Sequence, residues 1–357
     1  MFRQATPLFL ICETPLHAGS GDDLGVVDLP IQRERHTSFP KIEGSSLKGS
    51  LREAFENKLT GDAERKKIHL AFGFDEKTPN ESPDVKKHFG NDKQFQGALG
   101  FTDARLLLFP VKSMKGVFAW ITCERVLEQF KKDLALTDCK DKDQIVIPSE
   151  NTVPQHCELL FQNKAGKHIV LEEYTFTVTE EDKSNGVTTK LASWLSDQLF
   201  DRGTYWHNHL SRNLVVLSKD DFTDFVNLST EVITRTKINN ETGTVQDGAL
   251  FTEEYLPSES VLYSLALFSP LFHKAKTIEP FMGYVRELDP DDPEIEDKVQ
   301  RDEAKEAAAV KSFFDELPPV IQVGGNATIG KGLVRTRFVT SAMPISQNTA
   351  SSGGAEQ

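Results

Sequence analysis

Apolar residues recur at two spacings along the chain, and the spacing separates predicted strands from predicted helices. A short apolar run at 7–14 predicts a buried first strand. Leucine, alanine and phenylalanine then recur every three or four residues over 44–59. This second pattern predicts a helix that Ser45 or Ser46 can cap.

Later segments repeat both patterns. Strand-like segments lie at 98–111, 168–178, 260–269 and 320–339, strand-then-helix patterns at 116–130 and 212–229 (with Ser218 as a cap), and helical composition at 189–200 and 298–317. Short strands with few helices predict an α+β sheet fold.

Polar segments interrupt this pattern at four places. Residues 74–96 carry two prolines and predict a surface excursion, and 231–257 read as two strands around a polar, glycine-bearing tip, which predicts a hairpin. Residues 287–306 form an acidic segment, and 341–357 a flexible tail. We therefore expect one domain over 1–340, with these segments as insertions.

The charge is unevenly distributed. The chain has 357 residues and a formal net charge of −13, which argues weakly against nucleic acid as a partner. However, the acidic segment 287–306 alone holds ten acidic and three basic residues, whereas 31–52 holds five basic and two acidic ones. A basic face elsewhere on the molecule is therefore allowed.

Apolar runs and cysteine spacing indicate which classes of protein the sequence does not favour. No apolar run is long enough for a transmembrane helix, so we expect no membrane association. The four cysteines have neither a CxxC pair nor metal-ligand spacing, which favours reduced thiols in a cytoplasmic protein over a structural zinc site.

Two segments have the composition of phosphate-binding elements. At 44–52, small residues and Lys48 stand at a predicted helix N-terminus, where unpaired N–H groups favour phosphate. Lys48 and Arg52 would share a face there, but an ordinary capped surface helix has the same pattern. Residues 324–332 hold four glycines and Lys331. They do not match the P-loop pattern, so we reject a nucleotide-triphosphatase and leave open a backbone cradle or a wide hairpin turn.

Four residues are candidates for chemistry. Asp28 and His17 lie in the loop after the first predicted strand, and Glu253 and Tyr255 follow the hairpin tip. Taken alone, a loop aspartate most often makes a turn, a histidine packs, and a strand-edge glutamate is solvated.

Seven ordered segments, among them 16–34, 44–52, 97–111, 242–257 and 324–332, together resemble one family over about residues 8–338. The chain resembles the repeated backbone subunit of the type III-B CRISPR (Cmr) effector complex, in the RAMP superfamily. The resemblance implies a modified ferredoxin-like (RRM-type) core with a protruding thumb hairpin at 231–257. It also implies a target-RNA endoribonuclease whose partners are guide RNA, target RNA, further copies of the chain and other subunits of the complex.

The resemblance also assigns residues. Asp28 occupies the place of the catalytic aspartate, Lys48 that of a guide-contacting lysine, and His17, Glu253 and Tyr255 match positions of the cleavage site. We expect Ser45, Ser46, Gly49, Arg52, Gly324, Gly325 and Lys331 to contribute to RNA binding.

For the reaction we expect the target's own 2′-OH to attack the adjacent phosphate, once the thumb has displaced a base. An ordinary aspartate has a pKa near 3.9 and is a poor base at neutral pH. Asp28 is therefore predicted to hold or orient a hydrated Mg²⁺ or Mn²⁺, which cleavage would require. Two alternatives remain, a non-catalytic guide-RNA scaffold and a metal-independent ribonuclease that matures CRISPR RNA.

Overall fold

The computed structural model describes residues 2–22, 25–77, 81–90, 94–139, 145–164, 166–181, 186–272, 279–282 and 295–339. The strands are β1 Gln4–Cys12, β2 Lys41–Ile42, β3 Gly73–Asp75, β4 Gln94–Gln96, β5 Leu99–Phe101, β6 Ala104–Lys112, β7 Phe118–Cys123, β8 Thr152–Val153, β9 Phe161–Asn163, β10 Gly166–Leu171, β11 Tyr174–Thr177, β12 Thr179–Glu180, β13 Leu214–Leu217, β14 Glu231–Ile238, β15 Val245–Tyr255, β16 Val261–Phe268, β17 Val320–Gln322 and β18 Leu333–Phe338. The helices are α1 Gly44–Lys58, α2 Asp62–Phe72, α3 Pro83–Phe89, α4 Glu124–Ala135, α5 Val187–Leu199, α6 Tyr205–Asn213, α7 Lys219–Leu228, α8 Glu279–Met282 and α9 Ile295–Phe314.

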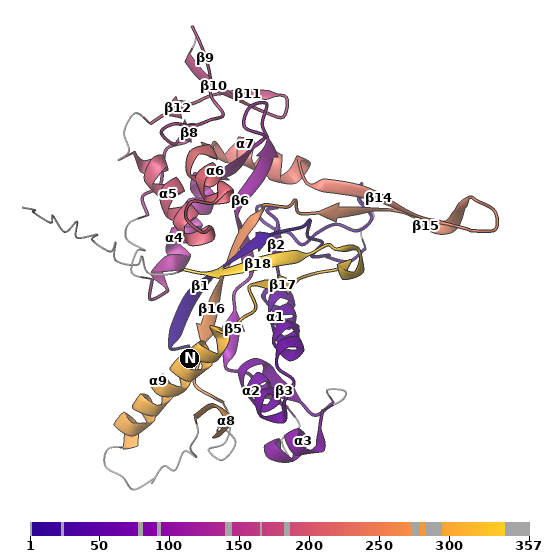
Figure 1. The fold of residues 1–357 in the computed structure, drawn as a ribbon, viewed down its shortest axis with the longest axis vertical. Coiled ribbons are helices and arrows are strands. Elements are labelled where there is room, and N and C mark those ends of the chain that lie inside the picture. The colour runs from indigo at the N-terminus through magenta and orange to yellow at the C-terminus, as the bar shows by residue number, and fades with distance from the viewer. Residues whose placement is uncertain are drawn as a thin grey trace, which may run out of the picture.

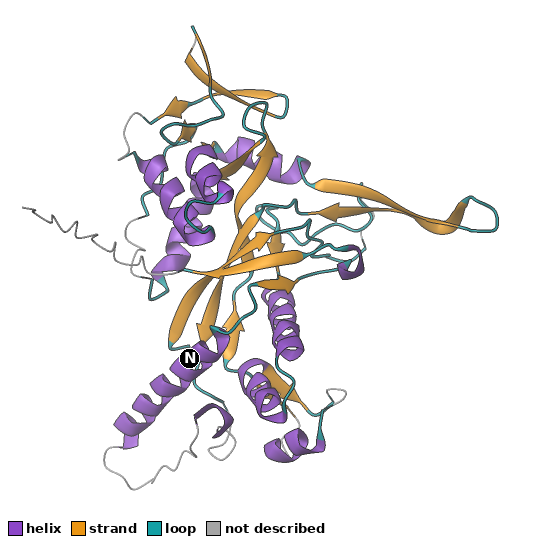
Figure 2. Cartoon of the chain, in the orientation of Figure 1, coloured by secondary structure: helices purple, strands orange, loops and turns teal. Residues whose placement is uncertain are grey.

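An 11-stranded mixed sheet forms the centre of the molecule (Figure 1). Its order is β12-β8-β13-β7-β6-β16-β1-β18-β17, with β2 paired to β6 and β5 to β16. The stretch β6-β16-β1-β18 is antiparallel throughout, while β13 runs parallel to β7. The helices gather in two groups, above and below the central strands (Figure 2). The predicted mixture of helices and sheet is confirmed.

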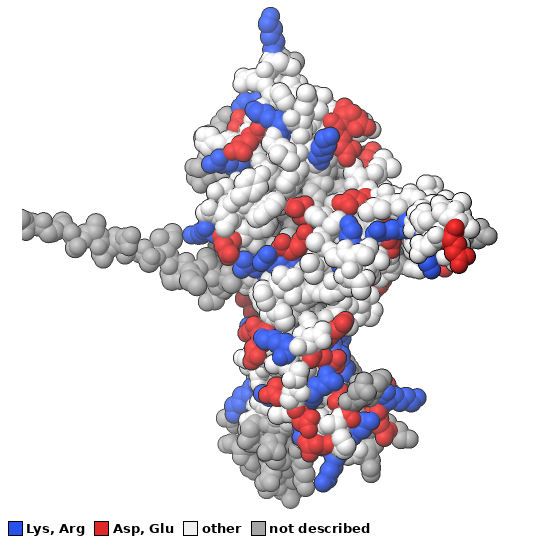
Figure 3. All heavy atoms as spheres, turned by 45° about the vertical axis from the view of Figure 1, so that its right-hand side comes forward, with Lys and Arg blue, Asp and Glu red and all other residues white. Residues whose placement is uncertain are grey.

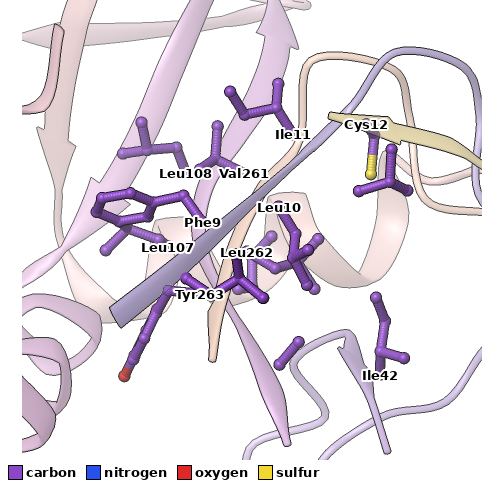
Figure 4. Packing of buried hydrophobic residues seen from close by; sticks show 14 of the residues in the cluster. Phe9, Leu10, Ile11, Cys12, Ile42, Leu107, Leu108, Val261, Leu262 and Tyr263 are labelled. Atoms are coloured by element: carbon purple, nitrogen blue, oxygen red, sulfur yellow. The ribbon is translucent and has the colours of Figure 1, made fainter. Parts of the chain in front are cut away.

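The core lies along the central strands. Leu8, Phe9 and Leu10 of β1 are fully buried, and β16 contributes the buried Val261 and Leu262. Leu107 and Leu108 of β6 pack beside them (Figure 4). The predicted first strand is present and buried, but it spans Gln4–Cys12 and not 7–14. The N–H groups of Glu13 and Thr14, beyond its end, donate to the Leu333 carbonyl at the start of β18.

The segment 74–96 differs from its prediction as a polar excursion. Its described residues form a small unit with α2, in which β3 pairs with β4 and α3 lies between the two strands in the chain. Phe74, Val85 and Phe89 are buried, and the rings of Phe74 and Phe89 lie 4.8 Å apart. The prediction was wrong because three apolar side chains suffice to anchor a segment that is otherwise polar.

Two further predictions need correction. The segment 168–178 is a hairpin of β10 and β11 rather than one strand, since Glu172 takes a positive φ at the turn. Of the acidic segment 287–306, residues 295–306 belong to α9 and 287–294 lie outside the described residues. Glu306 is fully buried and accepts a hydrogen bond from the backbone N–H of Leu271 at 3.0 Å, so this acid is not on the surface.

The predicted hairpin is present. β14 and β15 pair antiparallel from Glu231–Tyr255 to Ile238–Val245 and project far from the sheet (Figure 1). Cys12, Cys123 and Cys157 are buried free thiols. Within the described part of the chain, no helix is long and apolar enough to cross a membrane.

Candidate nucleic-acid interface

The loop after β1 returns along the base of the hairpin, where it pairs with the edge of strand β15. Leu29 forms a parallel bridge with Glu253: the Leu29 N–H donates to the Thr252 carbonyl, and the Glu254 N–H donates to the Leu29 carbonyl, each at 3.0 Å. This pairing fixes the position of Asp28. Its Oδ2 accepts hydrogen bonds from the Thr252 N–H at 2.7 Å and from the Thr252 hydroxyl at 2.8 Å.

Asp28 is exposed and ionised. The hydrogen bonds from the backbone and side chain of Thr252 hold the pKa of its carboxyl below the usual range. No group of three His, Cys, Asp or Glu side chains in the described ranges could hold a metal ion. Asp28 therefore belongs to no such group among the described residues.

The other three candidate residues come together on the hairpin base. His17 Nδ1 lies 2.7 Å from the Glu254 carbonyl oxygen, which can only accept, so Nδ1 carries the proton. His17 Nε2 then faces Glu253 Oε1 at 3.9 Å. The Tyr255 hydroxyl donates to Glu253 Oε2 at 2.5 Å.

Glu253 is a buried carboxylate that stays charged. Burial alone would raise its pKa, but hydrogen bonds from Tyr255, Asn326 and Arg235 outweigh burial and hold the pKa below its usual range. Burial and the neighbouring Glu253 raise the pKa of Tyr255, which keeps the hydroxyl protonated. The site therefore combines a carboxylate, a phenol and an imidazole ring whose Nε2 faces the carboxylate.

In the structure, the four candidate residues lie in two neighbouring clusters. Successive side chains of a strand point to opposite faces, so Thr252 lies on one face of β15 and Glu253 and Tyr255 on the other. Asp28 bonds to Thr252, and His17 faces Glu253. Among the described residues no hydrogen bond joins Asp28 to the other cluster, although the Leu29–Glu253 bridge links the two.

The glycine-rich turn between β17 and β18 lies against His17. The Gly325 N–H donates to the His17 carbonyl oxygen at 3.0 Å, and Gly324 has a φ of +74°. Lys331 places its ammonium 4.9 Å from the centre of the Tyr255 ring. These glycines therefore allow the turn to approach the chain's own loop after β1 closely.

The predicted cap of α1 is wrong. Glu43 is the N-cap residue, without a side-chain bond, and neither Ser45 nor Ser46 caps the helix. The reason is that Asp103, from the turn between β5 and β6, reaches the helix start and accepts from the Gly44 N–H at 2.9 Å. Ser45 and Ser46 are exposed instead, as is Gly49 on the next turn.

Two of the basic residues of α1, Lys48 and Arg52, bond to other parts of the chain. Lys48 Nζ donates to the Leu99 carbonyl at 2.9 Å, and burial lowers the pKa of its ammonium. Arg52 bonds to Glu56 and, through Nη1, to the Gly73 carbonyl. In this state neither is free to contact a phosphate. Basic and acidic side chains are interspersed over the face that carries the hairpin (Figure 3).

Comparison with known proteins identifies the family. A family profile described as the RAMP superfamily matches residues 9–335. The chain belongs to the RAMP superfamily. Over 323 residues, or 90% of this chain and 91% of the relative, it is 35% identical to a protein named CRISPR system Cmr endoribonuclease Cmr4 from Pyrococcus furiosus. A CMR subunit Cmr4 from Saccharolobus solfataricus is 28% identical over 276 residues, which are 72% of this chain and 82% of that relative. The family resemblance predicted from the motifs is confirmed.

Solved RAMP structures share the fold. The crystal structure of oligomeric Cmr4 from Pyrococcus furiosus has a TM-score of 0.61 at 26% identity, covering 95% of this chain and 99% of that one. A type III-B Cmr-beta complex bound to cognate target RNA contains a chain with a TM-score of 0.64 at 21% identity, with coverage of 94% and 98%.

Sequence reasoning missed three residues of this RAMP site, namely Arg235, Thr252 and Asn326. Arg235 and Thr252 are found only once the hairpin register is known, because the register decides which side chains share a face. Asn326 had one signal: it follows two glycines, and asparagine is among the few residues that tolerate a left-handed backbone. Its φ is 66°.

Proposed function

We propose that this chain is a repeated backbone subunit of a type III-B CRISPR ribonucleoprotein that binds guide RNA and cleaves complementary target RNA. The observation that carries the proposal is the 35% identity, over nine tenths of both chains, to a protein named as the Cmr endoribonuclease. Further copies of the chain and other subunits of the complex would be its protein partners, as the oligomeric relative suggests.

We infer that the centre of the sheet is a ferredoxin-like core. In chain order, β1, α1, β6, β16, α9 and β18 follow a β-α-β-β-α-β succession, and their spatial order β6-β16-β1-β18 is antiparallel. This is the arrangement expected of that core. The hairpin β14–β15 would be the thumb that displaces a base of the target strand.

Asp28 is proposed to face the scissile phosphate. It is exposed, ionised and fixed by two bonds to one oxygen, Oδ2. One carboxylate together with RNA phosphates is a common ligand set for Mg²⁺, so the residue fits a divalent metal site completed by the substrate. A cation held there would stabilise the charge that develops on the phosphate.

The remaining chemistry would be positioning and proton transfer. A base displaced by the thumb lets the 2′-OH align with the phosphorus and the leaving oxygen, which can contribute several kcal/mol. His17 Nε2, which faces the Glu253 carboxylate at 3.9 Å, is the atom of the second cluster proposed to take part in proton transfer. Guide binding would use the exposed Ser45, Ser46 and Gly49 and the turn at 324–331, with Lys48 swinging outward to reach the RNA.

Reconstitution tests the proposal. Complex assembled on guide RNA should cut a complementary RNA at regular intervals and leave a cyclic or 3′ phosphate and a 5′-OH. A complex that binds target without cutting would support the scaffold alternative. Cutting of precursor hairpins by the isolated chain would support the processing ribonuclease.

A further inference from the structure

Glu253 and Tyr255 are held by residues from two separate parts of the chain. Arg235, on strand β14 of the hairpin, donates through Nε to Glu253 Oε2 at 3.2 Å and through Nη2 to the Tyr255 hydroxyl at 2.7 Å. Asn326, on the glycine-rich turn, donates through Nδ2 to Glu253 Oε1 at 2.6 Å and to the same hydroxyl at 2.9 Å. Both residues thus contact both members of the pair.

The Arg235 contact depends on the shape of the side chain as well as on its charge. A guanidinium presents several donors in one rigid plane, whereas a lysine ammonium is a single point charge on a flexible stem. Here two nitrogens of one guanidinium meet two different acceptors. Lysine could replace the charge of Arg235 but could not make both contacts in the same geometry.

The Asn326 contact uses an uncommon backbone conformation. With φ 66° and ψ 27°, Asn326 lies in the left-handed region, which aims its amide back at the hairpin base. A left-handed residue other than glycine persists only where its surroundings maintain it. The two hydrogen bonds to Glu253 and Tyr255 are such a constraint.

We propose that Arg235 and Asn326 are positioning residues of the cleavage site, which fix Glu253 and Tyr255 in the orientation that faces His17. This inference rests on the proposed RNA cleavage. It links the hairpin to the chemistry, because Arg235 is part of β14 and moves with it. Displacement of the hairpin would therefore change the geometry of the carboxylate opposite His17 Nε2.

Two variants and one matched control test the inference in the reconstituted complex. Arg235→Lys keeps the positive charge and removes the rigid plane of donors that meets two acceptors at once. Asn326→Gly removes the amide, and glycine accepts the same φ without strain. Lys237→Gln is the control, because Lys237 is exposed, lies two residues along β14 from Arg235, and its loss removes a cation without touching Glu253.

The measurements are the affinity for target RNA and the single-turnover cleavage rate at saturating complex. We expect Arg235→Lys and Asn326→Gly each to slow cleavage at least about tenfold, because small misplacements of reacting groups are costly. The affinity of each variant for target RNA should stay within about twofold of the wild-type value, since the charge near the RNA is unchanged. Lys237→Gln should cleave at the wild-type rate.

A coupling measurement separates positioning from simple structural loss. In a Tyr255→Phe background, which already lacks the shared hydroxyl, the added cost of Arg235→Lys should fall to less than half its cost in the wild-type chain. Normal cleavage by both single variants, or a loss of affinity without a loss of rate, would overturn the inference and leave the proposed function intact. Absence of cutting by the wild-type complex would overturn both.

Discussion

Gly324 lies so close to His17 that a Cβ atom at position 324 would stand 2.2 Å from the His17 carbonyl oxygen. Its φ of +74° would also strain any other residue. Gly324→Ala should therefore lower the free energy of unfolding by about 2–4 kcal/mol, from strain and clash together, and should slow target cleavage by displacing His17. Urea unfolding of the chain and single-turnover cleavage measure the two effects.

Gly330 provides the matched control for that substitution. It has nearly the same backbone conformation, with a φ of +73°, but a Cβ there would meet nothing within 4 Å. Gly330→Ala should cost only the strain, about 1 kcal/mol, and should leave His17 in place. Equal losses in the two variants would show that contact with His17 is irrelevant.

Asp28→Asn should abolish target cleavage and preserve target binding. The amide oxygen can still accept from the Thr252 N–H, so the loop should keep its place while losing its charge. We expect a loss of at least about 100-fold in rate. Asp22→Asn, an exposed acid in the same loop, is the control and should cut normally. Near wild-type cutting by Asp28→Asn would exclude the carboxylate from the chemistry.

Removal of divalent metal should stop cleavage in the wild-type complex. Chelation should leave target binding intact, and Mg²⁺ or Mn²⁺ should restore cutting, because Asp28 alone is too weak a base at neutral pH. Hexaamminecobalt(III), which offers charge but no free coordination position, should fail to restore it. Full activity in chelator would leave proton transfer at His17 as the mechanism.

The hairpin tip should be dispensable for folding and necessary for cutting. Val232, Ile238, Val245 and Leu250 are all exposed, so replacing 238–247 with a short Gly-Ser turn removes little buried surface. Cleavage should fall by orders of magnitude, since in-line geometry would no longer be enforced, while guide affinity falls less. A folded variant that still cuts at regular intervals would place the thumb elsewhere.

Glu259 should reduce stability at neutral pH. Burial raises the pKa of its carboxyl, and the nearby Glu13 and Glu231 add to the effect. A raised pKa in the folded state favours folding below the unfolded value, about 4.3, and this contribution is lost as the pH rises through the folded pKa. Glu259→Gln should therefore unfold at a higher temperature than wild type at pH 7–8. Its gain in free energy of unfolding should be less than about 1 kcal/mol and should disappear near pH 4.

Glu128→Gln is the control for that comparison, since Glu128 is exposed on α4. Its melting temperature should follow the wild-type value at each pH. If the higher melting temperature of Glu259→Gln persisted undiminished at pH 4, the charge of Glu259 would not be its cause.

Periodicity predicted the elements whose own residues decide their structure. The first strand, the helix at α1 and the Ser218 cap of α7 followed from apolar spacing and a capping residue, and the structure confirms each of them. The cap of α1 did not follow, because its partner is Asp103, 59 residues further along the chain. A local pattern holds no information on such a contact.

For the candidate site, too, the sequence predicted the residues but not the contacts between distant parts of the chain. The motifs indicated His17, Asp28, Glu253 and Tyr255, but not that β15 would separate Asp28 from the other three. That separation depends on the alternation of side chains along one strand and on the register between the loop and β15. Lys48 was predicted to face phosphate from its position on a helix. Its bond to the Leu99 carbonyl appears only when β5 is placed beside that helix.

The position of β1 in the sheet has a consequence for synthesis of the protein. β1 begins at residue 4, yet its two partners are β16, at 261–268, and β18, at 333–338. The ribosome makes β1 long before either neighbour, so this central strand stays unpaired until β16 and then β18 have been made. Its exposed apolar edge is a site where nascent chains can aggregate or bind chaperones. A transcript that ended before β16 would thus yield a chain in which β1 lacks both partners.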